Sequence, residues 1–242
     1  MSNCKPTPLT VSSSMLDHCR WHLLADIGVL QQEALRRILA IAALAIKERG
    51  RFLLVLAGGE TPRGLYQQLR QAKANWSAWH IYFSDERCLP VNDPARNSRM
   101  AGEAWLDHAP IPARQIHLIA AELGAIQAAE AYANTLRNVG EFDLVLLGLG
   151  EDGHTASLFP GQAWAVAPIT TDTVAVLNAP KPPAQRVSLT ASRLSRTRQL
   201  LFLIKLAGKQ AAVTNWRAGK DLPARHMMPA NGVDILLAIT EK

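Results

Sequence analysis

Seven runs of apolar, mostly branched side chains are spaced along the chain. They span residues 51–58, 79–85, 115–120, 142–148, 173–179, 199–206 and 233–239. Their hydrophobicity is almost continuous rather than alternating, which indicates strands that are covered on both faces. Between these runs, helical spacing and length predict helices over 29–49, 62–72, 95–107, 121–138 and 209–217.

Strands and helices therefore alternate almost throughout the chain. This order predicts an α/β fold with right-handed crossovers and a largely parallel, doubly wound sheet that carries helices on both faces. A ligand site in such a fold lies beyond the carboxyl ends of the strands, so the loops that follow strands are the first places to examine. No repeat, low-complexity tract or linker divides residues 1–242, and we expect a single domain.

Composition and cysteine usage bear on the cellular location of the protein. Of the 242 residues, 48% are hydrophobic, which is enough for a full core, yet the longest apolar helical stretch, 38–46, is too short to cross a membrane. The first residues lack the apolar core of a signal peptide. Cys4, Cys19 and Cys88 form no CxxC pair, which fits reduced thiols. We expect a cytoplasmic protein with no membrane partner.

The charge pattern bears on possible partners. The formal net charge of +6 suits an anionic partner, either a polyanion or a small phosphorylated or carboxylated substrate. The densest basic segment, 186–198, lacks the aromatic interleaving and the folded motif of a nucleic-acid reader. We therefore expect a solvated basic face there and no nucleic-acid partner.

The first loop after a predicted strand reads "LAGGETPRGLY" (56–66). Gly58 and Gly59 allow close approach to the backbone, Thr61 is a candidate N-cap, and Pro62 suits the first position of a helix. Free N–H groups at such a turn can bind a phosphate, although an ordinary glycine turn explains the two glycines equally well. The loop matches neither the dinucleotide-binding fingerprint nor the P-loop, which disfavours a dinucleotide or ATP.

The second loop begins "FSDERC" (83–88) and places Ser84, Asp85, Glu86 and Arg87 directly at a strand end. One hydroxyl, two carboxylates and a guanidinium could meet a polar ligand there. A local ion-pair network that fixes the loop is an equally good interpretation.

The third loop lies in "LVLLGLGEDGHTASLFPG" (144–161). A neutral imidazole at His154 can remove a proton from water near neutral pH, and Asp152 could hold its tautomer; a structural histidine in a turn is the alternative. The other six histidines form no spaced ligand set with His154, so no metal site is expected. Ser157 lies outside any G-x-S-x-G pattern, which disfavours a serine nucleophile.

Four motifs occur in register: "LAGGETP", "SDERCLPVNDPARNSRM", "LVLLGLGEDGHTASLFPG" and "PKPPAQRVSLT" (180–190). Over about residues 30–218 the chain resembles the 6-phosphogluconolactonases of the pentose phosphate pathway, in the superfamily that also holds glucosamine-6-phosphate deaminases. The resemblance implies a Rossmann-like fold of the type shared with ribose-5-phosphate isomerases and CoA transferases. It also implies hydrolysis of 6-phospho-D-glucono-1,5-lactone to 6-phosphogluconate without a metal or organic cofactor.

The resemblance also implies catalytic roles. His154 would be the general base that activates water, and Asp152 would orient the imidazole or the water. The developing oxyanion needs a donor, for which Arg87 and the backbone N–H groups of residues 148–153 are both candidates.

For the substrate, the resemblance assigns Asp85 to sugar binding and the glycine turn to the 6-phosphate. Gly58, Gly59 and Thr61 would hold that phosphate together with Arg186 and Lys209.

Three positions depart from the family pattern. Glu60 stands inside the phosphate loop, where its carboxylate would repel the ligand unless it points away. Leu206 replaces a frequent glycine before Lys209, and the neighbours of Asn97 also differ, which leaves the placement of Lys209 and the substrate role of Asn97 open.

Two other functions are weighed against the lactonase. A deaminase or isomerase of amino-sugar phosphates would supply a carboxylate just after the D-G-H turn, where this chain reads "ASLFPG" (156–161). A non-enzymatic sugar-phosphate sensor would more readily lose His154 and would usually carry a DNA-binding segment. We therefore expect a lactonase that acts on a small phosphosugar lactone as a monomer or weak homo-oligomer.

Overall fold

The computed structural model describes residues 18–162 and 171–240. Its main sheet has six strands in the order β1-β9-β8-β5-β2-β3, and every neighbouring pair is parallel. Their bounds are β1 Cys19–Leu24, β2 Phe52–Leu56, β3 Trp79–Phe83, β5 Phe142–Leu147, β8 Thr197–Lys205 and β9 Val233–Ala238. The predicted class, an α/β fold with a largely parallel sheet, is confirmed.

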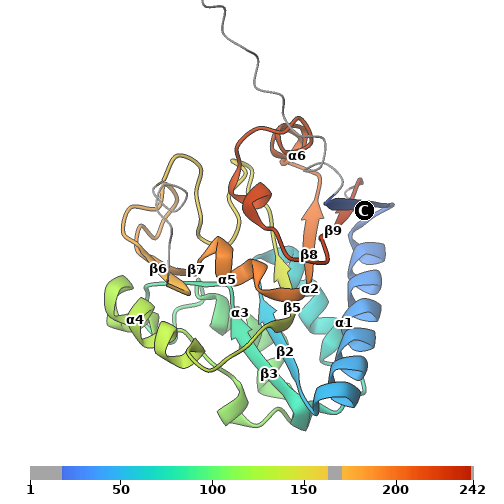
Figure 1. Cartoon of the computed structure of the whole chain (residues 1–242), viewed down its shortest axis with the longest axis vertical. Helices are drawn as coiled ribbons and strands as arrows, with labels where there is room; N and C mark the ends of the chain where they lie inside the picture. Colours follow the sequence, from blue (N-terminus) through green and yellow to red (C-terminus); the bar gives the residue numbers. More distant parts are fainter. Residues whose placement is uncertain (1–17, 163–170, 241–242) are drawn as a thin grey trace, which may run out of the picture.

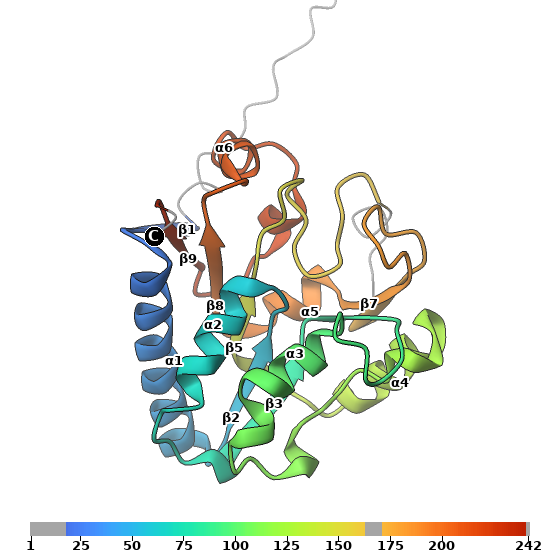
Figure 2. The ribbon, with the colours of Figure 1, turned by 180° about the vertical axis from the view of Figure 1, so that it is seen from behind.

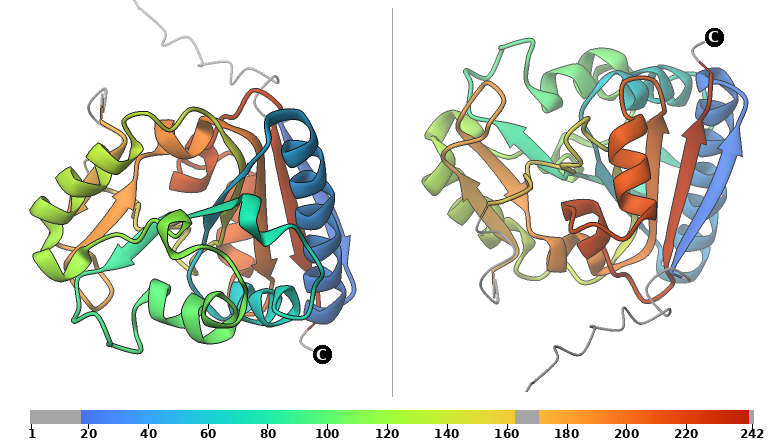
Figure 3. Two further views of the ribbon diagram at one scale, coloured as in Figure 1. Left: turned by 90° about the horizontal axis from the view of Figure 1, so that it is seen from below. Right: turned by 90° about the horizontal axis from the view of Figure 1, so that it is seen from above.

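A second, antiparallel sheet of three strands was not predicted. It has the order β4-β7-β6, with β4 Asp85–Arg87, β6 Thr173–Val176 and β7 Arg186–Leu189. The small sheet lies to one side of the main sheet, and α4 (Ala125–Leu136) packs on it (Figures 1 and 3). The chain passes from β3 to β4 at Ser84, so the predicted strand 79–85 joins one sheet to the other.

The remaining helices are α1 Ile27–Arg49, α2 Glu60–Leu69, α3 Asn97–Ala104, α5 Ala191–Ser195 and α6 Gln210–Arg217. Short 3₁₀ turns occupy Trp76–Ala78, Leu106–His108, Ala113–Gln115, Ala121–Leu123 and Pro223–His226. α1 packs against α2 and against the main sheet, while α6 stands beyond the carboxyl end of β8 (Figure 1).

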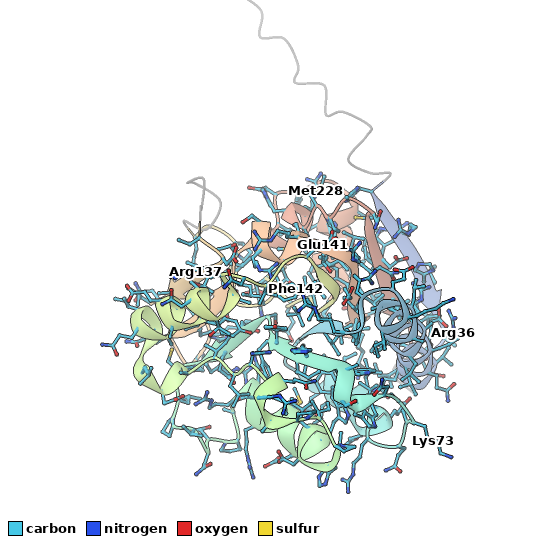
Figure 4. The ribbon with its side chains drawn as sticks, turned by 60° about the horizontal axis from the view of Figure 1, so that its bottom comes forward. Arg36, Lys73, Arg137, Glu141, Phe142 and Met228 are labelled. Atoms are coloured by element: carbon cyan, nitrogen blue, oxygen red, sulfur yellow. The ribbon has the colours of Figure 1, made fainter. Side chains whose placement is uncertain are left out.

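Local chemistry explains where α1 begins and ends. The Asp26 side chain accepts the N–H of Val29 at 2.9 Å, and Gly50, at φ 73°, donates its N–H to Ile46 O. The buried face of α1 recurs with helical spacing, and its polar face is exposed, as for Arg36 (Figure 4).

The predicted strand 115–120 is wrong. Only one bridge joins this segment to β3, between Ile116 and Ile81. The reason is the buried side chain of Gln115, whose Nε2 donates to the carbonyl oxygens of Ser77 and Trp79 at 2.9 and 2.7 Å. A side-chain amide thereby occupies a carbonyl at the start of β3 that a neighbouring strand would otherwise pair with.

The expectation of a solvated basic face over 186–198 is also wrong in part. Arg186 and Arg193 are only 5% and 1% exposed, and the guanidinium of Arg193 lies 3.7 Å from the ring centroid of Phe142. Residues 186–189 form β7 and residues 191–195 form α5, whereas Arg196 and Arg198 are exposed. The basic segment 186–198 therefore contains a strand, β7, whose Arg186 contributes to the site described below.

Candidate functional site

A polar pocket of about 250 Å³ lies between the carboxyl ends of β2, β5 and β8 and the small sheet. The segments that follow β5 and precede β7 stand at this end of the molecule, as Figure 2 shows in yellow and orange. The predicted site residues that line the pocket are Gly58, Gly59, Thr61, Asp85, Arg87, His154, Arg186 and Lys209. Asp152 does not line the pocket but contacts His154. The structure thus brings all nine predicted residues to one place.

The loop after β5 folds into a tight turn that presents His154. The Gly150 N–H donates to His154 O at 2.7 Å, and the Gly153 N–H donates to Gly150 O at 3.0 Å. Gly153 has φ 87°, a conformation that side chains other than glycine rarely adopt. Thr155 closes the turn by donating from Oγ1 to Gly148 O at 2.8 Å.

Within this turn, His154 and Asp152 form a close pair. Nδ1 of His154 is hydrogen-bonded to Oδ1 of Asp152, which also accepts the His154 backbone N–H at 3.2 Å. A carboxylate at Nδ1 favours the tautomer that carries the proton there, which leaves Nε2 as the basic nitrogen. The imidazole is 19% exposed and packs against Phe159, with ring centroids 4.6 Å apart.

Burial sets the protonation of this pair. Desolvation lowers the pKa of His154, and nearby Lys181 lowers it further, while Asp152 opposes the change. Burial alone would raise the pKa of Asp152, but the hydrogen bonds and charge of His154 outweigh it, so the pKa is lowered. His154 is therefore mostly neutral and Asp152 ionised at neutral pH, which is the state a general base requires.

Asp85 is a buried carboxylate at the pocket wall. Its Oδ2 accepts from Ser157 Oγ at 2.6 Å, and its Oδ1 accepts from Ser84 Oγ at 3.1 Å and Asn97 Nδ2 at 3.2 Å. These donors hold the carboxylate in a fixed orientation. Ser157, which has no nucleophilic pattern in the sequence, thus serves to fix Asp85.

Glu86, unlike Asp85, does not line the pocket. Its carboxylate accepts the backbone N–H groups of Asn97 and Ser98 at 2.7 and 2.8 Å and lies 3.5 Å from Nε of Arg96. It therefore satisfies the N-terminus of α3. Glu86 supports the interpretation that charged residues fix the "SDER" loop, whereas Asp85 lines the pocket and its role toward a ligand stays a prediction.

Arg87 reaches the pocket from β4. Nη1 donates to Ala95 O, while Nε is buried and has no hydrogen-bond partner within the described part of the chain. An unpartnered buried donor on a pocket wall is a candidate to bind a ligand oxygen.

The turn after β2 differs from its prediction in one detail. Gly59, at φ 105°, is the N-cap of α2, whereas Thr61 lies within the first turn. No side chain caps this helix, so its first N–H groups are open to an anion. A Cβ on Gly58 would lie 2.0 Å from Oδ1 of Asn97, which shows that contact with Asn97 requires this glycine.

The structure shows how each of the three departures from the family pattern is accommodated. The Glu60 side chain is 87% exposed and lies 3.7 Å from Arg63, so its carboxylate stays at the outer edge of the pocket. Leu206 still forms the turn, because its carbonyl accepts the Lys209 N–H at 2.8 Å and Gly208 supplies φ 74°. Asn97 is buried and lines the pocket.

Lys209 is the N-cap residue of α6 and a largely buried cation. Desolvation lowers its pKa, as do the charges of Lys181 and Lys205, while Glu151 opposes the change. One side of the pocket therefore has a positive electrostatic potential. It comes from the Lys209 ammonium and from the N-termini of α2 and α6.

Sequence analysis missed Lys181 as a site residue. It lies in the pocket wall within "PKPP", one of the four motifs, so its signal was present in the sequence. Within residues 18–162 and 171–240, no group of three or more His, Cys, Asp or Glu side chains could hold a metal ion. No helix in the same ranges is long and apolar enough to cross a membrane.

Fold and site together define an α/β protein with a carboxylate-held imidazole and a positively charged region in one pocket. The chain belongs to the family described as glucosamine-6-phosphate isomerases/6-phosphogluconolactonase, whose model matches residues 25–236. It is 35% identical to the 6-phosphogluconolactonase of Synechocystis over 86% of this chain and 90% of that protein. It is also 35% identical to the 6-phosphogluconolactonase of Mycobacterium tuberculosis, over 81% of this chain and 85% of that protein.

Solved structures agree with this membership. The chain is similar to the 6-phosphogluconolactonase of Thermotoga maritima with a TM-score of 0.84 and 27% identity, over 91% of this chain and 100% of that one. The 6-phosphogluconolactonase of Trypanosoma brucei matches with a TM-score of 0.81 and 27% identity, over 90% of this chain and 95% of that one. The predicted family resemblance is confirmed.

Proposed function

We propose that this protein hydrolyses 6-phospho-D-glucono-1,5-lactone to 6-phospho-D-gluconate in the pentose phosphate pathway. The observation that carries the proposal is the pair of His154 and Asp152 in a pocket that also holds Lys209 and the N-terminus of α2. The names of the curated relatives support the same reaction. A cytoplasmic setting suits the free thiols of Cys19 and Cys88.

The chemical step begins at Nε2 of His154. With Asp152 holding the Nδ1 proton, Nε2 removes a proton from water as the water oxygen attacks the lactone carbonyl carbon. The lowered pKa of His154 keeps the ring unprotonated near neutral pH. Positioned general-base catalysis of this kind typically contributes about 10²- to 10⁴-fold in rate.

The 6-phosphate occupies the positive side of the pocket in this proposal. The open N–H groups at the start of α2, with Gly58, Gly59 and Thr61, bind its oxygens, and Lys209 neutralises its charge. Arg186 also lines this pocket, and Asp85 accepts hydrogen bonds from the sugar hydroxyl groups. Arg87 and the backbone N–H groups of residues 148–153 are candidate donors for the oxyanion.

A deaminase or isomerase is the nearest alternative. Such a reaction moves protons between carbon and oxygen and would use a further acid beside the imidazole. In the segment that follows the D-G-H turn, the side chain that packs on His154 is the apolar ring of Phe159, at 4.6 Å between centroids. This contact favours water attack on a lactone over proton shuttling.

The test is to measure both reactions on the purified full chain. Lactone disappearance is followed with and without protein, because the lactone also hydrolyses spontaneously, and ammonia release is followed from glucosamine 6-phosphate. We expect a rate well above the blank with the lactone and no ammonia release. A lactone rate equal to the blank, or efficient deamination, would refute the proposal.

A further inference from the structure

Lys181 is a pocket cation that forms no hydrogen bond or ion pair with a carboxylate of residues 18–162 or 171–240. It lies in the segment between β6 and β7 and lines the pocket that His154 and Gly150 also line. Among the ion pairs and hydrogen bonds of the described residues, none uses its ammonium group. A cation that faces a pocket with no carboxylate bound to it is available for an oxygen of the ligand.

Arg186 fixes the backbone that carries Lys181. Its Nη2 donates to Lys181 O at 2.9 Å and to Pro182 O at 3.1 Å, and its Nε donates to Pro183 O at 3.1 Å. The Arg186 guanidinium also lies 5.4 Å from the ring centroid of Phe159, the residue that packs on His154. Arg186 thus directs several of its N–H donors to the carbonyl oxygens of residues 181–183. This makes Arg186 a positioning residue for Lys181.

Lys181 and His154 line the same pocket, and Arg186, which holds the Lys181 backbone, also lies over Phe159, the ring that packs on His154. Lys181 lowers the pKa of His154 and also that of Lys209, so its charge is felt at both. Lys181 is therefore the lysine that acts on the general base, and a carbonyl oxygen next to that base lies within its influence.

We propose that Lys181 is a catalytic residue that contacts the lactone carbonyl oxygen, held in place by Arg186. The proposal rests on the lactonase function proposed above and assigns the oxyanion to a side chain that sequence analysis did not consider.

Hydrolysis of the lactone passes through a tetrahedral intermediate. The water oxygen forms a bond to the carbonyl carbon while His154 Nε2 takes a water proton, and the carbonyl π electrons move to the oxygen beside the Lys181 ammonium. When the tetrahedral intermediate collapses, the bond from that carbon to the ring oxygen breaks, and imidazolium returns its proton to the ring oxygen. The carboxylic acid product then ionises. No oxidant or other co-reactant is needed.

The first test separates the carbonyl from the phosphate. Lys181→Met is compared with Lys205→Met, which removes a nearby cation that does not line the pocket. Loss of one oxyanion donor should lower kcat about 10²- to 10³-fold with KM little changed. The same loss in kcat/KM should appear with unphosphorylated glucono-1,5-lactone. A raised KM with kcat retained, confined to the phosphorylated lactone, would make Lys181 a phosphate ligand and overturn the proposal.

The second test does not depend on turnover. The pKa of the His154 imidazole, followed by NMR, should rise in Lys181→Met because the cation that lowers it is gone, and should not change in Lys205→Met. Arg186→Gln should also raise this pKa, since the released loop carries Lys181 away. An unchanged pKa in Lys181→Met would refute the placement. A shifted pKa in a protein that lacks lactonase activity would refute the proposed function and leave the placement standing.

Discussion

Gly150 offers a sharp test of the catalytic geometry, because the atoms nearest to an added methyl group all belong to the His154–Asp152 pair. A Cβ at this position would lie 2.0 Å from Nδ1 of His154, 2.2 Å from its Cε1 and 2.6 Å from Oδ1 of Asp152. An ordinary contact begins at 3.4 Å, so the imidazole nitrogen must recede by 3.4 − 2.0, or about 1.4 Å. The φ of Gly150 is not positive, so the alanine adds no left-handed strain.

The expected consequence is a loss of rate rather than of fold. A displacement of about 1 Å in a catalytic group can cost about 10²-fold, and here both members of the pair are pushed. We expect Gly150→Ala to lower kcat by about 10²- to 10³-fold while the far-ultraviolet circular dichroism spectrum is kept.

The matched control is Gly140→Ala, where a Cβ meets nothing within 4 Å and φ is not positive. Its kcat should equal that of the wild type. Turnover of Gly150→Ala within about threefold of the wild type would refute the reasoning, since a step that needs oriented imidazole should not tolerate this shift.

Three further predictions concern separate parts of the site. Asp152→Asn removes the carboxylate that raises the pKa of His154, so the acid limb of the kcat/KM profile should move to lower pH, and a shift to higher pH would contradict the pairing. Glu86→Gln breaks a buried ion pair with Arg96 and weakens the cap of α3, so urea unfolding should show a loss of about 3 kcal/mol; unchanged stability would refute the structural role. Lys209→Met should raise KM with kcat nearly kept, whereas a pure kcat loss would place that ammonium at the carbonyl.

The main-sheet strands that could be predicted from the sequence were those with almost continuous apolar runs, because burial on both faces leaves a simple pattern. β2 and β5 are buried at every position. β1 was missed because "CRWHLL" mixes polar and apolar residues, as suits an edge strand in which no residue is fully buried. β7 was missed because its Arg186 is buried through carbonyl contacts that no local pattern records.

The site was predicted as a set of loops, and the order of parallel strands explains why. Loops after β2, β5 and β8 must meet at one edge of the sheet, so Gly59, His154 and Lys209 had to converge once the strands were assigned. The contacts between loops could not be predicted in the same way. The bond from Ser157 to Asp85 spans 72 residues of sequence and depends on how the small sheet sits beside the main one.

The most direct test of the account is the lactonase rate of His154→Ala beside that of the wild type, each corrected for spontaneous hydrolysis. The account predicts a fall of at least about 10²-fold in kcat, with 6-phosphogluconate still bound at near wild-type affinity because the phosphate contacts lie elsewhere in the pocket. Near wild-type turnover in His154→Ala would contradict the claim that this imidazole is the general base.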